Sequence, residues 1–248
     1  MEDIPQPAQP HAESFLARPT RALWEAGGLL GLVVLLAILV PVGQLGLDHS
    51  WSDAMRDLET PALTDLALAF NWLGRGLGRA LGLTLIGLLL LRRRRWLALA
   101  AFAVAESLAP LLSVLLKALT DRPRPSDGLI HVTGPSFPSG HATYAAATCL
   151  ALVLLFTTPG THRRWWGSGL ATLGVIGMAW SRTYLEVHWL SDVVAGALLG
   201  TGVSLFVFAI AQQHQSWIVD ELLSRSSRRL RAQGKRVART GTRDDQRL

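Results

Sequence analysis

The sequence predicts an all-α integral membrane protein, a bundle of six transmembrane helices with short interfacial helices. Three observations lead to this class. Half of the 248 residues are hydrophobic, only 17% are charged against about 25% in an average soluble domain, and the mean hydropathy is +0.30. The apolar residues are also gathered into long runs instead of following the period of an amphipathic helix, which is typical of segments that cross a bilayer.

Three parts of the chain follow from this pattern. Residues 1–20 are polar, acidic and rich in proline, which predicts a disordered cytoplasmic lead and not the basic start of a cleaved secretion signal. Residues 21–215 hold the apolar runs and form the membrane domain. Residues 216–248 are strongly polar and form a basic cytoplasmic tail.

Six apolar runs are predicted to span the membrane. They lie at about residues 23–45, 77–91, 96–116, 142–158, 167–184 and 189–211. The segment between the first two runs, residues 48–79, is too polar to span, and we expect an interfacial amphipathic helix at its start. Helix ends within this segment are not defined by the sequence.

The charges of the loops set the orientation. Basic clusters precede the first run, separate the second from the third and the fourth from the fifth, and follow the sixth. With six spans all four clusters fall on one side, which the positive-inside rule makes the cytoplasm. Both termini are then cytoplasmic, in the inner membrane of a cell, and the remaining loops, after Lys117 and around His188, are extracytoplasmic.

The net charge of +6 belongs to the tail. Residues 221–248 contain nine Lys or Arg and three acids, so the rest of the chain is neutral. This pattern predicts contact with anionic lipid heads. It does not favour nucleic acid, because no aromatic interleaving accompanies the charge. The single cysteine, Cys149, excludes an intrachain disulfide, and no metal-binding spacing of His and Cys is present.

Three cations, Lys117, Arg124 and Arg182, lie near the ends of predicted spans on the extracytoplasmic side. Phosphoryl transfer requires the charge on the nonbridging oxygens to be neutralised as the transition state develops. Lys and Arg can do this without a metal ion, and Arg binds phosphate oxygens through two parallel hydrogen bonds. The alternative is that each cation simply extends toward the lipid heads.

A second stretch, Pro138 to His141, directly precedes the fourth span. The backbone N–H groups of Ser139, Gly140 and His141 are expected to point out of a helix N-terminus and bind an anion there, and Gly140 allows the backbone to approach a phosphate closely. Ser139 can cap the helix and also donate to phosphate. His141 is placed to protonate a leaving oxygen as general acid.

The third stretch contains His188 and Asp192, four residues apart. On a helix this spacing puts both side chains on one face. The carboxylate can accept the Nδ1 proton of His188 and leave Nε2 free as a nucleophile. The alternative is that Asp192 only caps the sixth span.

Together the stretches resemble the type 2 phosphatidic acid phosphatase superfamily. The pattern is Lys-x6-Arg-Pro, then Pro-Ser-Gly-His, then Ser-Arg-x5-His-x3-Asp, and it covers residues 117–192. The resemblance implies a six-helix membrane enzyme, a lipid phosphatase that needs no metal and no cofactor. In this sequence it makes His188 the nucleophile that becomes a phosphohistidine, Asp192 its orienting partner and His141 the acid. The phosphate ligands it implies are Lys117, Arg124, Ser139, Gly140 and Arg182.

The substrates that the resemblance implies are membrane lipid phosphates: phosphatidic acid, phosphatidylglycerol phosphate, lysophospholipid phosphates or undecaprenyl pyrophosphate. A phosphotransferase, a noncatalytic phospholipid-binding or transport protein, and a vanadium haloperoxidase, which resembles the family at the same motifs but is soluble, are the alternatives. Three residues depart from the pattern or lack a role. Glu186 is expected to face solvent, the alternatives being that it raises the His188 pKa or contacts the substrate head group. Arg122 is expected either to pair with Asp121 or a lipid head or to contact the substrate, and Glu106 has no predicted partner.

Overall fold

The computed structural model describes residues 13–40 and 45–244, with side chains as far as residue 217. All regular structure in these ranges is helical, so the predicted all-α class is confirmed. The helices are α1 (Pro19–Leu39), α2 (Gly46–Asp57), α3 (Pro61–Leu73), α4 (Gly76–Arg92), α5 (Trp96–Thr120), α6 (Gly140–Phe156), α7 (His162–Tyr184) and α8 (Leu190–Asp244).

Residues 13–211 form one compact unit, and the described part of a second unit, residues 212–244, is helical. The predicted basic tail from residue 216 is therefore helical up to Asp244. Most of the predicted disordered lead, residues 1–12, lies outside the described residues. The three-part division of the chain stays a prediction.

Local sequence explains where several helices begin. Thr60 caps α3 by accepting a hydrogen bond from the Leu63 N–H, and Pro61 follows at the first helical position. Thr161 caps α7 in the same way. The predicted helix at the start of segment 48–79 is present as α2, and its interfacial position stays a prediction.

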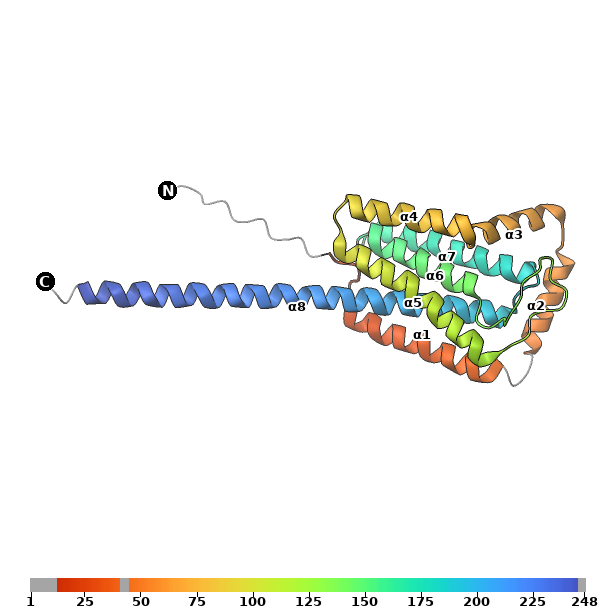
Figure 1. Ribbon diagram of the computed structural model, residues 1–248, viewed down its shortest axis with the longest axis horizontal. Helices are drawn as coiled ribbons and strands as arrows, with labels where there is room; N and C mark the ends of the chain where they lie inside the picture. Colours follow the sequence, from red (N-terminus) through yellow and green to blue (C-terminus); the bar gives the residue numbers. More distant parts are fainter. Residues whose placement is uncertain (1–12, 41–44, 245–248) are drawn as a thin grey trace. The chain divides into compact units, whose positions relative to one another are not determined.

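Helix α6 lies at the centre of the bundle and packs against α5 and α7. Helix α3 packs against α7, and α4 against α5. The main apolar core is built from α1, α4, α5, α6 and the first half of α8, with buried residues such as Phe102, Leu154 and Phe208. Helix α2 and the loop between α5 and α6 lie at the same end of the bundle (Figure 1).

Within the described residues, three helical segments are long and apolar enough to cross a membrane: Pro19–Leu39, Trp96–Thr120 and Leu190–Trp217. Helices α3 and α4 meet at a bend of 52° and add a fourth span if they are counted together. Helix α6 is apolar but has only 17 residues. The protein is thus a helical membrane protein with three or four candidate spans by this measure, and six spans stay a prediction.

Two glycines bring α8 into direct contact with α6. A Cβ on Gly196 would lie 2.5 Å from the Ser139 carbonyl oxygen, and one on Gly200 would clash with the Thr143 carbonyl oxygen. Small residues four positions apart let two helix backbones approach closely, as in membrane helix pairs generally. This contact holds the N-terminal ends of α6 and α8 together.

We expect Gly200→Ala to destabilise the protein, because the added methyl group must displace the α6 backbone, at a cost of about 1–3 kcal/mol or more. Gly169→Ala is the control, since a Cβ at Gly169 meets nothing within 4 Å. Thermal unfolding in detergent should give a lower Tm for Gly200→Ala and an unchanged or higher Tm for Gly169→Ala. Equal Tm values for the two variants would contradict the close contact.

Candidate active site

The three motif stretches meet at the end of the bundle that also holds α2. His188 lies in the short connection between α7 and α8, and Asp192 lies in the first turn of α8. The His188 Nδ1 and Asp192 Oδ2 atoms are 3.4 Å apart. Asp192 Oδ2 also accepts a hydrogen bond from the Trp189 N–H at 2.9 Å. The carboxylate therefore both caps α8 and faces the imidazole, so the two alternatives for Asp192 hold together.

The other ring nitrogen of His188 identifies the tautomer. Arg124 Nη1 lies 3.2 Å from His188 Nε2. A guanidinium has only donors, so Nε2 must be the acceptor and the proton resides on Nδ1, facing Asp192. Burial lowers the pKa of His188 to about 4, although Asp192 opposes this shift, and the charges of Arg124 and Lys117 add to the lowering. The imidazole is consequently neutral at pH 7, with the lone pair of Nε2 directed at Arg124.

Backbone carbonyls hold two of the predicted cations. Lys117 Nζ donates to the carbonyl oxygens of Pro135 and Ser136, at 2.8 and 3.1 Å. Arg124 donates to Pro135 at 3.1 Å, to Gly134 at 2.9 Å and to the Val187 carbonyl at 2.6 Å. The loop between α5 and α6 thus fixes both side chains next to His188.

His141 and Arg182 complete the group. His141 lies close enough to both Arg182 and His188 to interact with them electrostatically. Arg182 is 1% exposed, and its Nη1 donates to Asn71 Oδ1 on α3 at 2.6 Å. Within the described part of the chain, His141 Nε2 and Arg182 Nε are buried without a hydrogen-bond partner. Buried polar atoms are rarely left unpaired, so both point to a ligand that binds here.

The Pro-Ser-Gly-His stretch opens α6 as predicted. Ser139 is fully buried and caps the helix, its Oγ accepting from the Ala142 N–H at 3.5 Å. Its own N–H donates to the Asp192 carbonyl oxygen at 2.9 Å and is not free for an anion. A Cβ on Gly140 would meet only Ser113 Oγ, at 3.9 Å, so the space beside Gly140 is open.

Two sequence expectations at the site are wrong. Arg122 pairs with neither Asp121 nor lipid: it is 4% exposed and forms ion pairs with Asp192 at 2.5 Å and Asp48 at 2.7 Å. Glu186 does not face solvent, because it is 2% exposed and accepts a hydrogen bond from Ser52 Oγ at 2.6 Å. Burial raises the pKa of Glu186.

Sequence reasoning missed several partners. Asp48, Ser52 and Asn71 come from the segment whose helix ends could not be placed. They lie 74, 134 and 111 residues from their partners Arg122, Glu186 and Arg182. No local spacing signals such contacts. Glu106, which lacked a predicted partner, accepts a hydrogen bond from Thr148 Oγ1 at 2.9 Å.

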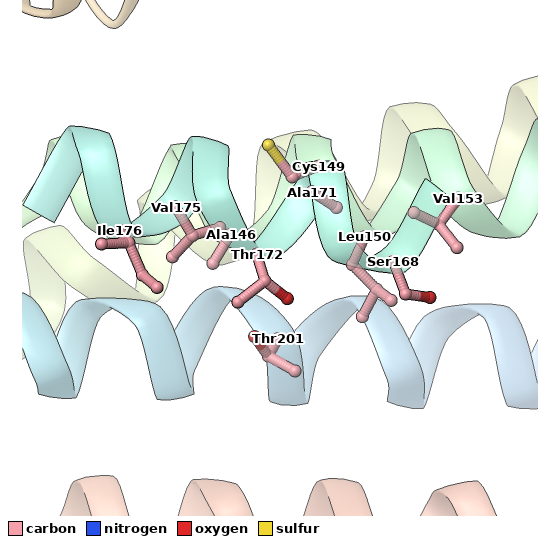
Figure 2. Close-up of a pocket in the computed structure, with 10 residues that line it drawn as sticks. All are labelled: Ala146, Cys149, Leu150, Val153, Ser168, Ala171, Thr172, Val175, Ile176 and Thr201. Atoms are coloured by element: carbon pink, nitrogen blue, oxygen red, sulfur yellow. The ribbon is translucent and has the colours of Figure 1, made fainter. Parts of the chain in front are cut away.

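An apolar cavity of about 290 Å³ lies between α6, α7 and α8 (Figure 2). The lining residues are Ala146, Cys149, Leu150, Val153, Ser168, Ala171, Thr172, Val175, Ile176 and Thr201. Ala146 is five residues from His141, which corresponds to about 8 Å along a helix. The nearest lining residue is therefore about one and a half turns of α6 from His141, and none of the predicted site residues lines the cavity.

The described residues contain no group of three or more His, Cys, Asp or Glu side chains that could hold a metal ion. The polar groups that converge here are instead two imidazoles and three cations, with the Asp192 carboxylate behind His188. Such a set is suited to an anion with several oxygens.

Comparison with known proteins agrees with this chemistry. Residues 96–216 match the PAP2 superfamily. Over 141 residues the chain is 38% identical to the decaprenylphosphoryl-5-phosphoribose phosphatase of Mycobacterium tuberculosis (strain CDC 1551 / Oshkosh), a match that covers 54% of this chain and 72% of that protein. It is 39% identical over 72 residues to the undecaprenyl-diphosphatase of Sulfolobus acidocaldarius, covering 29% of this chain and 32% of the relative.

The fold is similar to that of a transmembrane PAP2-type phosphatidylglycerolphosphate phosphatase from Bacillus subtilis, with a TM-score of 0.63 and 23% identity. This similarity covers 77% of the present chain and 97% of the other. The chain spans only about a third of the length of two other curated relatives that it matches.

A helical membrane fold with a histidine–aspartate pair among clustered cations defines a phosphate-handling membrane protein. The chain belongs to the PAP2 superfamily. The family predicted from the three motifs is therefore confirmed, and so is the enzyme class, a lipid phosphatase.

The contact between Asn71 and Arg182 gives a testable prediction. If Arg182 holds the phosphate, as the sequence predicts, Asn71→Asp should bind phosphate more weakly than Asn71→Ala, because a carboxylate at this position neutralises the Arg182 guanidinium. We expect KM to rise several-fold for Asn71→Ala and at least tenfold for Asn71→Asp, with thermal stability lower in Asn71→Ala than in Asn71→Asp. Similar KM values for both variants would mean that Arg182 does not face the substrate.

Proposed function

We propose that this protein hydrolyses a lipid phosphate monoester or diphosphate through a phosphohistidine on His188, without a metal ion. The observation that carries the proposal is the state of the imidazole. Its Nε2 lone pair faces Arg124 and its Nδ1 faces Asp192, which is the tautomer that a nucleophilic histidine needs.

In the first step, Nε2 attacks phosphorus, the bond from phosphorus to the leaving oxygen breaks, and His141 donates a proton to that oxygen. Asp192 stabilises the positive charge that develops on the imidazole. In the second step, water attacks phosphorus, its proton passes to His141 and the N–P bond breaks, so that inorganic phosphate leaves. Lys117, Arg124 and Arg182 neutralise the phosphoryl oxygens in both steps.

Ser139 and Gly140 have a more indirect role in this proposal. Ser139 fixes the start of α6 by capping it, and Gly140 leaves room for a phosphoryl oxygen beside the helix N-terminus. The expectation that the Ser139 N–H binds phosphate is dropped, because that group is hydrogen-bonded to Asp192.

The substrate class that we propose is a membrane lipid phosphate: phosphatidic acid, phosphatidylglycerol phosphate or undecaprenyl pyrophosphate. Two of the relatives are named for polyprenyl phosphates, and the structural neighbour for phosphatidylglycerolphosphate. The apolar cavity, whose nearest lining residue is about 8 Å along α6 from His141, offers room for part of a hydrocarbon chain. This supports a lipid substrate over a soluble phosphate ester.

We further propose that six segments cross the cytoplasmic membrane: α1, the bent pair of α3 and α4, α5, α6, α7 and the first half of α8. Both termini then lie in the cytoplasm, the basic tail contacts anionic lipid heads, and His188 faces the extracytoplasmic side. The four basic clusters of the sequence support this orientation.

The proposal predicts phosphate release from at least one of the three lipids by detergent-purified protein in excess EDTA. His188→Ala should lower that rate by more than about a thousandfold while the protein remains folded, because no nucleophile replaces the imidazole. His162→Ala, at an exposed position on α7, is the matched control and should retain full activity. An active His188→Ala variant would exclude the phosphohistidine, and no release by folded protein would favour a phosphotransferase or a binding protein.

The topology is tested with single cysteines in a Cys149→Ala background. We expect a membrane-impermeant maleimide to label Ser126→Cys in intact cells, because this exposed residue lies in the loop beside the site. Arg93→Cys, at an exposed position between α4 and α5, should be labelled only after the cells are permeabilised. Labelling of both positions in intact cells would overturn the six-span arrangement.

A further inference from the structure

A buried ionic network lies behind the histidine–aspartate pair. Arg122, in the loop that follows α5, donates from Nη1 to Asp192 Oδ1 at 2.5 Å and to Ser191 Oγ at 2.8 Å. From Nη2 it donates to Asp48 Oδ2 on α2, at 2.7 Å. Asp48 also accepts from the Ser191 N–H at 2.8 Å and from Ser191 Oγ at 2.7 Å. All four side chains are buried.

The network divides the two oxygens of Asp192 between different partners. Oδ1 binds Arg122, whereas Oδ2 faces His188 Nδ1 and accepts from the Trp189 N–H. A carboxylate held at both oxygens cannot rotate about its terminal bond. The direction in which Oδ2 points at His188 is therefore fixed by Arg122, and the position of Arg122 is fixed in turn by Asp48.

The network also sets how strongly Asp192 attracts the proton on His188. A guanidinium placed between two carboxylates shares its charge between them. Without Arg122, Asp192 would be a stronger base and would favour the imidazolium form of His188. Without the charge of Asp48, Arg122 would act on Asp192 alone and would weaken that attraction. The other charged or titratable groups that act on His188 are Lys117 from α5, Arg124 from the loop and His141 from α6.

We propose that Arg122 is a positioning residue for His188, and that Asp48 on α2 completes this positioning by holding Arg122 against Asp192. The motif pattern of the family does not include either residue. The inference rests on the proposed role of His188 as nucleophile. Helix α2, the short helix at the end of the bundle, thereby becomes part of the machinery that orients the reacting atom.

The test compares Arg122→Met, Asp48→Asn and the conservative Arg122→Lys in the full chain. The first readout is independent of lipid turnover: diethyl pyrocarbonate modifies neutral imidazole, and mass spectrometry follows the modification of His188 against pH. The second readout is kcat and KM for phosphate release from phosphatidylglycerol phosphate. Arg56→Met is the control, since Arg56 lies on the same helix but forms only exposed ion pairs with Asp53 and Asp127.

We expect Arg122→Met to raise the midpoint of His188 modification by about one pH unit or more and to lower kcat at least tenfold, with KM changed less than threefold. Asp48→Asn should move the midpoint in the opposite direction. Arg122→Lys should have a higher kcat than Arg122→Met, because lysine restores the positive charge. Its kcat should stay below that of the parent protein, because one ammonium group cannot bind Asp192 and Asp48 as the two guanidinium nitrogens do. Arg56→Met should match the parent protein in both readouts.

An unchanged midpoint in both Arg122→Met and Asp48→Asn would overturn the proposal and would leave the network as a means of docking α2. A rise in KM with constant kcat would also overturn it, because Arg122 would then bind substrate. If Arg122→Met does not fold, the isosteric Asp48→Asn provides the test, and an unchanged midpoint of His188 modification in that variant would overturn the proposal. If the parent protein releases no phosphate from any lipid, the proposed function fails, while the modification of His188 still measures the effect of Arg122.

Discussion

The structure depends on compensation of the charges buried at one end of an apolar bundle. An isolated charge in such a place costs several kcal/mol, whereas a charge that is paired and hydrogen-bonded is tolerated. Arg122 is paired with two carboxylates, and Lys117 and Arg124 are held by backbone carbonyl groups. Arg182 is held by the amide of Asn71. The long polar loop after α5 supplies both carbonyl groups that hold Lys117 and two of the three that hold Arg124, so it has to fold for these two cations to be placed.

The same compensation leaves the site with a net attraction for anions. The carbonyl groups that hold Lys117 and Arg124 satisfy hydrogen bonds without cancelling charge. Of the four cations, Arg122 alone forms ion pairs with acids within the described part of the chain. An incoming phosphate therefore replaces no existing ion pair at Lys117, Arg124 or Arg182. The carboxylate nearest to the site, Asp192, turns one oxygen to Arg122 and the other to His188, so neither oxygen opposes the substrate directly.

The parts of the fold and site that could be predicted from the sequence are those formed by residues close together in the chain. His188 and Asp192 are four residues apart, and the Ser139–His141 stretch begins a helix, so their geometry follows from helical periodicity and capping. Asp48 meets Ser191 across 143 residues and Asn71 meets Arg182 across 111, and these contacts follow only from the packing of α2 and α3. The number of spans has the same limit, because α3 and α4 are divided by a bend and α6 is short.

The close contact between α6 and α8 has a consequence for how substrate preference can change. His141 and Asp192 lie in the first turns of two helices whose backbones approach closely at Gly196 and Gly200, so the relative position of these two side chains depends on that contact. Variation that moved these helices apart would disrupt the chemistry along with the lipid fit. Evolution toward a lipid with a different head group or hydrocarbon chain is therefore expected to change residues of α2, α3 and the cavity lining, and to leave the contact between α6 and α8 unaltered.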